Sequence, residues 1–565
     1  MVLGADFACA QAPTPQDVNR ALQQQKQILQ QREERRREDL RDLRKTLTPP
    51  NVVEKEDPSF RDRSKNCARV KKMRFEGADL LGEDVKAAIE EPYRNACMTI
   101  IDIMSVVRVV TNWYINKGYV TTRCYPPEQD LSRGILTIKV IEGRTESVEI
   151  KEDGKPRRGA DNAFPRMVGK RLYIRDIEQG IDQINRLPSQ DARIRIEPGG
   201  KDGYSTIKVD TAKKRFPLVR SSINNHGLTS TGELQASTTV YVDDVLGLYD
   251  AWSFSYKDSD EFYSGPQRSN ELSASVSIPW GYWTLLASFS SFDYLTTIHG
   301  LNQQFKSDGG SRYYTVELDY VFHRDQVSKS RISAFLNFKD TENFVEDIRL
   351  TSGSRKLNVI GTRLSHTRRA LGGVLDVSVA GDFGAPMFGS LRDEDSLPGS
   401  PSAEFSKISG NFSFYRPFKL GELPVAWSVQ GYGQRSSQDL YNTEQVSLGG
   451  LYTVRGFRNE SIAGDGGAYV RNELIVTLPY VLAARTKWIF GDLDLVAALD
   501  AGWLVNDAED DAFEHGSMKG GAAGVRLHGG LLYGEAFWEK AFEAPSFIEE
   551  EDSIFRFQAG VALQW

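Results

Sequence analysis

Apolar and polar residues alternate along the C-terminal part of the chain, where helical spacing stops after Arg215. The last segment shows the pattern most clearly, because polar and small residues occupy every second position. Its apolar positions are Phe555, Phe557, Ala559, Val561, Leu563 and Trp565. A two-residue period predicts β-strands with one apolar and one polar face. We therefore expect residues 214–565 to form a β-sheet structure.

Sixteen such segments follow one another. They are centred on residues 217–227, 234–243, 250–259, 269–279, 282–296, 311–324, 329–343, 355–368, 373–383, 404–417, 424–437, 467–479, 487–504, 517–529, 531–542 and 553–565. Short links such as 279–283 and 528–530 alternate with long polar links such as 297–310 and 505–516. An even strand number with loops of unequal length at the two ends is typical of a transmembrane antiparallel β-barrel. A soluble sandwich would also alternate, but it does not predict this asymmetry.

Two similar units precede the strands. Residues 67–143 contain the pattern of a strand, two helices and two strands, which is a βααββ unit. The same order recurs over 144–213, with a short helical piece near 164–169 and a longer helix over 173–187. In the longer helix, Tyr173, Ile177, Ile181 and Ile184 follow helical spacing, and most of them are expected in the core. The spacing does not show which of them line a groove.

The N-terminal part has a different character. Residues 1–15 lack the charged start and apolar stretch of an intact signal peptide, so we expect a mature, disordered end. Residues 16–46 are rich in helix formers and predict a helix that is polar on almost every side. Residues 47–66 contain prolines and charges without a period, which predicts an extended linker.

Composition narrows the possible functions. The net charge of −7 and the absence of a basic stripe give no reason to expect a nucleic-acid partner. No run of 18 apolar residues is present, which excludes a membrane-spanning helix. Six histidines and four cysteines lack the spacings of metal or nucleophile sites, and no phosphate-binding loop motif occurs. We therefore expect neither an enzyme nor a bound cofactor or metal.

The cysteines predict one disulfide. Cys67 and Cys97 flank a predicted strand and helix, and linking them would constrain the unfolded chain by roughly 3.6 kcal/mol. Four cysteines allow three complete pairings, and spacing alone does not choose between them. We favour a bond between Cys67 and Cys97, with buried free thiols as the alternative. Cys9 and Cys124 stay unassigned.

A short motif lies between the eleventh and twelfth predicted strands. It consists of Val454, Arg455, Gly456 and Phe457, inside the long connection 438–466. On these features the chain resembles the TpsB family, the outer-membrane transporters of two-partner secretion, in which this loop folds into the barrel lumen. The family's partner motif on the barrel wall is matched at residues 498–502 by Asp500 and Gly502. Its usual aromatic residue is replaced by Ala498, which leaves the packing of the loop tip open.

Strand parity supports a pairing between the two motifs. Asp500 falls on the lumen side together with Asp492 and Asp494, opposite a face that includes Leu495 and Leu499. A guanidinium and a carboxylate in a partly hydrated lumen can form a bidentate pair, which is stronger than an exposed one. We expect Arg455 to reach a lumen carboxylate. The alternative is that Arg455 is a solvated loop charge.

The resemblance also implies a domain plan and a function. The two βααββ units look like the family's periplasmic POTRA domains, and CdiB-type transporters carry a polar N-terminal helix as a pore plug, which residues 16–46 would match. A free or coiled-coil helix is the alternative. The implied location is the bacterial outer membrane, reached with the barrel-assembly machinery. The implied partner is a secreted TpsA-type exoprotein, such as a CdiA-like toxin or adhesin. An outer-membrane assembly factor and a porin are the alternative functions.

Overall fold

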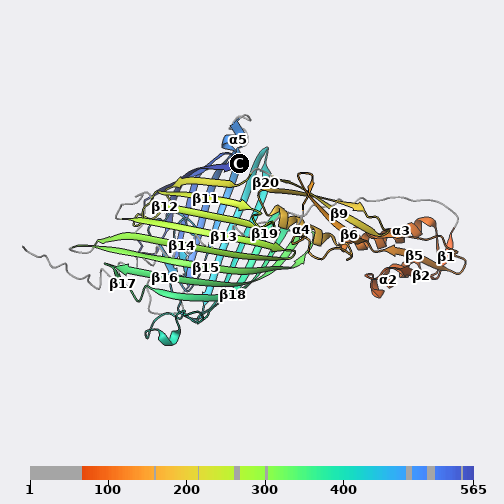
Figure 1. Cartoon of the computed structure of the whole chain (residues 1–565), viewed down its shortest axis with the longest axis horizontal. Helices are drawn as coiled ribbons and strands as arrows, with labels where there is room; N and C mark the ends of the chain where they lie inside the picture. Colours follow the sequence, from red (N-terminus) through yellow and green to blue (C-terminus); the bar gives the residue numbers. More distant parts are fainter. Residues whose placement is uncertain are drawn as a thin grey trace, which may run out of the picture.

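Two small α/β domains project from one end of a large β-barrel (Figure 1). The computed structural model describes residues 67–157, 161–213, 216–259, 267–299, 303–478, 486–505, 516–548 and 552–564. The segments expected as a disordered end, a plug helix and a linker, 1–15, 16–46 and 47–66, lie outside these described residues. Within the described part of the chain, no helix is long and apolar enough to cross a bilayer.

The first α/β domain packs two helices on a small sheet. Its elements are β1 (Ala68–Val70), β2 (Lys72–Glu76), α2 (Glu83–Glu90), η1 (Glu91–Tyr93), β3 (Ala96–Met98), α3 (Ile100–Asn116), β4 (Arg123–Tyr125) and β5 (Ile135–Ile141). The sheet order is β2-β5-β4, with β2 parallel to β5. Helix α3 starts at a capping box, in which Thr99 and Asp102 bond to each other's backbone N–H. Its buried face supplies Val106, Val110 and Tyr114 to the core.

A disulfide closes this domain. Cys67 and Cys97 are bonded, with 5.2 Å between their Cα atoms, and β1 pairs with β3 beside them. Cys124 is a free thiol in the same domain, and burial raises its pKa. The bond ties the start of β1 to the strand that leads into α3.

Replacing Cys67 and Cys97 by serine should lower the free energy of unfolding of the first domain by about 3 kcal/mol, because the unfolded chain regains loop entropy. The measurement is the rate of limited proteolysis within the domain of the detergent-solubilised protein. Cys124→Ser is the matched control and should leave the rate unchanged. Equal proteolysis of the double variant and the wild type would contradict the prediction.

In the described residues of the second α/β domain there is one helix rather than the two that the sequence predicts. It consists of β6 (Arg144–Glu152), β7 (Lys155–Pro156), α4 (Ile174–Asn185), β8 (Gln190–Pro198) and β9 (Tyr204–Lys213), with sheet order β7-β6-β9-β8. Ile177 and Ile184 are buried in its core, and Ile181 packs against them. Three of the four residues at helical spacing therefore belong to the core or pack against it, as the sequence predicts.

The helical piece expected near 164–169 is wrong. This segment runs as turns in which Arg166 and Gly169 have positive φ angles, so the chain cannot continue as a helix. Tertiary contacts decide the conformation. Phe164 covers Gly180 of α4 so closely that a Cβ there would clash, and the Asn162 side chain donates to backbone carbonyls of Leu248 and Pro279 in the barrel.

The barrel has sixteen strands, as the alternation predicts. They are β10 (Leu218–Asn224), β11 (Gln235–Asp243), β12 (Ala251–Ser259), β13 (Arg268–Trp280), β14 (Trp283–His299), β15 (Gln304–Arg324), β16 (Ser328–Val345), β18 (Arg355–Ala370), β19 (Gly373–Gly384), β20 (Ser406–Leu420), β21 (Leu423–Ser436), β24 (Gly466–Leu478), β25 (Asp492–Val505), β26 (Gly516–His528), β27 (Leu532–Glu543) and β28 (Ile554–Gln564). Pairing of β10 with β28 closes the barrel. The two-residue β17 (Ile348–Arg349) only extends the end of β16.

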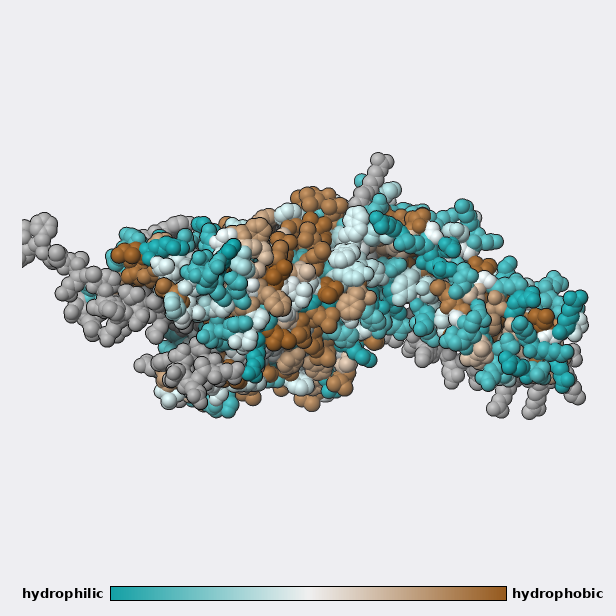
Figure 2. Space-filling view, turned by 90° about the horizontal axis from the view of Figure 1, so that it is seen from below, coloured by the Kyte–Doolittle hydropathy of each residue, from teal (hydrophilic) through white to brown (hydrophobic). Residues whose placement is uncertain are grey.

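Each strand turns apolar side chains outward and polar ones inward. The exposed apolar side chains include Phe254, Leu285, Leu318, Val379, Ile408, Leu474, Leu499 and Leu563. On the face seen in Figure 2, a hydrophobic band crosses the barrel wall between hydrophilic surfaces at both ends. A band of this kind is what a bilayer requires of a barrel.

One predicted loop is largely strand. Residues 297–310 were expected as a long polar connection, yet β14 runs to His299 and β15 starts at Gln304. The glycines and polar residues of this stretch suggest a loop, because the sequence does not show the neighbouring strands with which they pair. In the fold, Ile298 and Phe305 lie opposite each other in the β14–β15 ladder and pack with Val345.

Candidate functional site: a loop folded into the barrel

The connection between β21 and β24 turns back into the barrel. Residues 440–450 are all buried, although several of them are polar. Two short strands, β22 (Val446–Leu448) and β23 (Ile462–Gly464), pair with each other and make the loop a two-stranded arm. The arm carries its own small core, in which Leu448, Val454 and Phe457 pack against Leu504 and Met518 of the wall. Apolar contact therefore fixes the arm inside the lumen.

Glycine allows the tip of the arm to touch the wall. Gly456 has a φ of 98°, and a Cβ at this position would lie 2.4 Å from the backbone of Lys540 in β27. Gly502 of β25 plays the reciprocal part, because a Cβ there would lie 2.6 Å from Leu448 of the arm. A larger residue at position 456 would push the arm away from the wall, whereas one at position 502 would require the Leu448 side chain to move.

Arg455 lies at the centre of this contact. Its Nε is 2.6 Å and its Nη2 2.8 Å from the two carboxylate oxygens of Asp500, and its backbone N–H also donates to Asp500. Nη1 lies 2.6 Å from Glu473 of β24. Arg455 is 3% exposed, so the structure brings Arg455 and Asp500 together as a buried bidentate pair.

Glu473 is a contact of Arg455 that the sequence does not predict. Strand parity could have indicated it. Glu473 is directly opposite Ala498 in the β24–β25 ladder, so it shares the lumen face with Asp500. Asp494 also faces inward but contacts Thr477 and His528 instead of Arg455. Choosing among lumen carboxylates therefore required the three-dimensional path of the loop.

A second ion pair holds the other side of the tip. Arg556 of β28 lies 2.8 Å from Glu539 of β27, and both are buried. Arg556 also donates to the backbone carbonyl of Phe457, and the Gly456 N–H donates to Glu539. In the sequence, Glu539 and Arg556 stand out only as polar residues in strands where polar and apolar residues alternate.

Ala498 occupies the place of the family's usual aromatic residue. It is buried in a cluster with Val496, Ala522 and Phe537. Phe537 of β27 belongs to the same cluster and packs against Gly524 of the intervening strand β26. The aromatic ring in this part of the wall therefore comes from β27 and not from position 498.

Charged contacts also join the second α/β domain to the near rim of the barrel. Arg324, at the end of β15, reaches Glu178, Gln179 and Asp182 of α4 at 3.3, 3.1 and 2.6 Å. Arg186 donates to the Tyr249 carbonyl, and burial lowers its pKa to about 10. The domain is thus fixed to the barrel rim by several buried polar contacts.

A hydroxyl group adds to this junction. Tyr282, in the turn between β13 and β14, donates to the carboxylate of Asp176 at 2.7 Å. Burial raises the pKa of Asp176, while this hydrogen bond acts in the opposite direction. Gln179 and Gln183 of α4 both donate to the carbonyl of Gly281 in the same turn.

Known protein families match the barrel and both α/β domains. The family described as haemolysin secretion/activation protein ShlB/FhaC/HecB matches residues 203–527, a POTRA domain of ShlB type matches 68–143, and a further POTRA domain matches 144–198. The outer membrane transporter CdiB of Escherichia coli is 35% identical over 91% of this chain and 85% of its own length. CdiB of Dickeya dadantii is 31% identical over 97% and 95%.

Solved structures of CdiB proteins are similar to this chain as well. CdiB from Escherichia coli superposes with a TM-score of 0.84 at 32% identity, covering 98% of this chain and all of that one. CdiB from Acinetobacter baumannii, at 20% identity and a TM-score of 0.76, shares the fold. From these matches over most of its length, the chain belongs to the ShlB/FhaC/HecB family of haemolysin secretion/activation proteins.

Proposed function

We propose that this protein is the transporter of a two-partner secretion system, which exports one exoprotein through its barrel. It is an outer-membrane protein with two periplasmic POTRA domains. The observation that carries the proposal is the arm held in the lumen by Arg455, Asp500 and Glu473, on a barrel with POTRA domains at its rim. A diffusion porin needs neither feature, and an assembly factor of the same superfamily typically has more POTRA domains.

The exoprotein would enter from the periplasmic side in an unfolded state. In the first POTRA domain, β2 lies at the edge of its sheet, where an extended client could add a strand by β-augmentation. The second domain is fixed to the barrel rim, so a client bound there is already beside the lumen. Folding of the exoprotein outside the cell would supply the direction of transport without a nucleotide.

The client is expected to be a TpsA-type exoprotein. Relatives of this chain include proteins named CdiB and the hemolysin transporter ShlB of Serratia marcescens, which is 29% identical over 73% of this chain. We propose a CdiA-like toxin or an adhesin as the cargo class. Outer-membrane lipid would surround the hydrophobic band of the barrel.

The proposal is tested by export itself. Cells that make a candidate exoprotein should display it to external protease only when this protein is also present. An exoprotein that stays in the periplasm would contradict the transporter function. Loss of other outer-membrane proteins on deletion of this chain would favour the assembly factor, and loss of small-solute uptake would favour the porin.

Residues 16–46 are proposed as a plug that closes the barrel at rest. Deleting them should raise the single-channel conductance in planar bilayers, because a polar helix would leave the lumen. Replacing the same residues by a flexible linker of equal length is the matched control for chain length and should raise it equally. Unchanged conductance would rule out the plug.

A further inference from the structure

The first limb of the arm, residues 440–450, contacts a part of the wall that lies outside the two sequence motifs. Glu444, four residues after Leu440, is almost completely buried between two lysines. Lys339 Nζ of β16 lies 2.7 Å from one carboxylate oxygen, and Lys407 Nζ of β20 lies 3.0 Å from the other. The two lysines come from strands that are not neighbours in the barrel. One carboxylate therefore links two separate strands to the loop.

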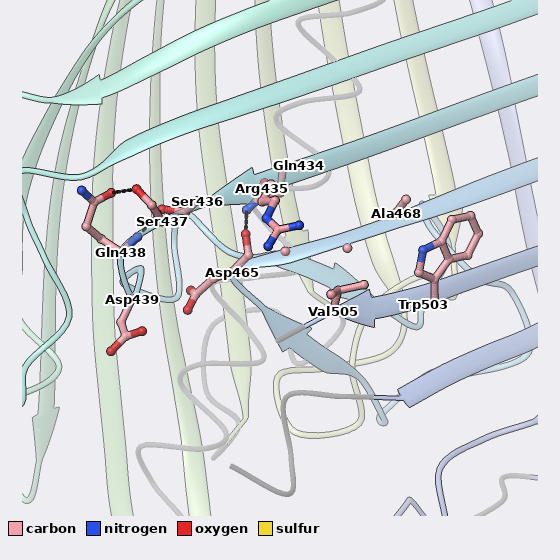
Figure 3. A pocket seen from close by; sticks show the side chains of 12 residues that line it. Gln434, Arg435, Ser436, Ser437, Gln438, Asp439, Asp465, Ala468, Trp503 and Val505 are labelled. Atoms are coloured by element: carbon pink, nitrogen blue, oxygen red, sulfur yellow. Dashed lines mark hydrogen bonds between the residues drawn. The ribbon is translucent and has the colours of Figure 1, made fainter. Parts of the chain in front are cut away.

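The same lysines also hold the backbone of the limb. Lys339 donates to the carbonyl of Thr443 at 3.2 Å, and Lys407 donates to the carbonyl of Glu444 at 3.1 Å. Gln434 of β21 donates to the carbonyls of Glu444 and Asp465, at 2.9 and 3.2 Å. Figure 3 shows the bond from Gln434 to Asp465, where the two limbs leave the wall. The position of Glu444 is thus defined by its backbone as well as by its charge.

The charges at this site are the reverse of those at the tip. At the tip a loop cation lies between wall carboxylates, whereas here a loop carboxylate lies between wall cations. Lys407 also lies 3.8 Å from Asp382 of β19. Removing the Glu444 charge would leave two buried ammonium groups without the carboxylate between them, with Asp382 as the remaining carboxylate beside Lys407, and losing one partner of a buried ion pair is costly. The site should therefore hold the limb strongly while Glu444 is ionised.

We propose that Glu444 is a positioning residue that anchors the base of the arm independently of Arg455. The loop then has two attachment regions, one at the tip on β24, β25, β27 and β28 and one at the base on β16 and β20. Loss of Arg455 would weaken the tip attachment, which keeps only its contacts with β27 and β28 and its apolar packing, and would leave the first limb in the lumen. Full clearance of the pore would require both attachments to open. This inference rests on the proposed function, since it concerns how the transporter opens.

Two buried threonines provide separate probes. Thr443 is 1% exposed beside the base, and Thr453 is 0% exposed beside the tip. Each is replaced by cysteine in a chain whose Cys9 and Cys124 are serine. Intact cells without the exoprotein are treated with a membrane-impermeant polyethylene-glycol maleimide. Labelling at exposed Ser437→Cys gives the rate for an accessible site on the same loop.

In the Glu444→Gln background, labelling of the Thr443→Cys probe should become roughly tenfold faster, as expected when a local opening is favoured by about 1.4 kcal/mol. The Thr453→Cys probe should stay protected in that background. In the Arg455→Ala background the result should reverse, with the tip probe labelled and the base probe protected. Lys339→Met should act like Glu444→Gln, which covers the case in which one variant fails to fold.

Heat-modifiable gel mobility identifies folded barrels, and only these are compared. Protection of the base probe in both folded Glu444→Gln and folded Lys339→Met would overturn the proposal. Labelling of both probes in the Glu444→Gln background or in the Arg455→Ala background would also overturn the proposal, because the loop would then move as one unit. Labelling is read without any exoprotein, so its failure leaves the proposed transport function untouched, and failed export leaves the labelling result intact.

Discussion

Replacing Arg455 by alanine should abolish export of the exoprotein while the barrel still folds. The substitution removes three charge-assisted contacts and leaves Asp500 and Glu473 without the guanidinium between them. Breaking a buried ion pair by removing one partner typically costs about 3–5 kcal/mol. This loss falls on the loop rather than on the strand ladder, whose backbone hydrogen bonds do not involve Arg455. Surface exposure of the exoprotein and heat-modifiable mobility of the barrel are measured side by side.

Arg455→Lys is the informative companion. It keeps the positive charge but cannot bridge Asp500 in a bidentate manner, so export should fall between the wild type and alanine. The matched control is Arg416→Ala, because Arg416 is an exposed arginine near the C-terminal end of β20. This variant should export normally. Wild-type export by a folded Arg455→Ala barrel would refute the role of the pair, and an unfolded barrel would show that the pair is needed for assembly instead.

Replacing Arg324 by methionine should loosen the second POTRA domain from the barrel and strongly reduce export. The Arg324 side chain is about 5% exposed and lies between Glu178 and Asp182 of α4. Methionine has a similar length but removes the guanidinium from both carboxylates, which keep only Arg175 and Lys329 as cationic partners, so the loss is on the order of 2 kcal/mol. The direct measurement is the rate of limited proteolysis at the junction of detergent-solubilised protein.

The control for this junction is Arg193→Met, because Arg193 pairs with Asp191 on the exposed surface of the same domain. An exposed pair contributes at most about 1 kcal/mol, so proteolysis and export should both stay near wild type. Equal proteolysis of Arg324→Met and wild type would contradict a rigid attachment. Faster proteolysis with normal export would show that the attachment is not needed for transport.

Several features followed from local pattern alone. The two-residue period predicted sixteen strands and their faces, because an inward or outward side chain is decided by its neighbours along the strand. The helix at 173–187 and the core role of Ile177 followed in the same way from a period near 3.6 residues. The disulfide between Cys67 and Cys97 was predicted because the two cysteines flank a predicted strand and helix, and the structure confirms this bond.

The sequence by itself determined the barrel, the strand parity, the inward position of Asp500 and the motif around Arg455, since each depends on residues that are close in the chain. Tertiary structure alone decided the rest. Glu473, Glu539 and Arg556 became partners of the tip, and Glu444 met Lys339 and Lys407, because barrel closure and an inward loop bring together residues up to about a hundred positions apart. The segment at 164–169 became turns for the same reason: burial of Phe164 against Gly180 outweighs its weak local preference for a helix.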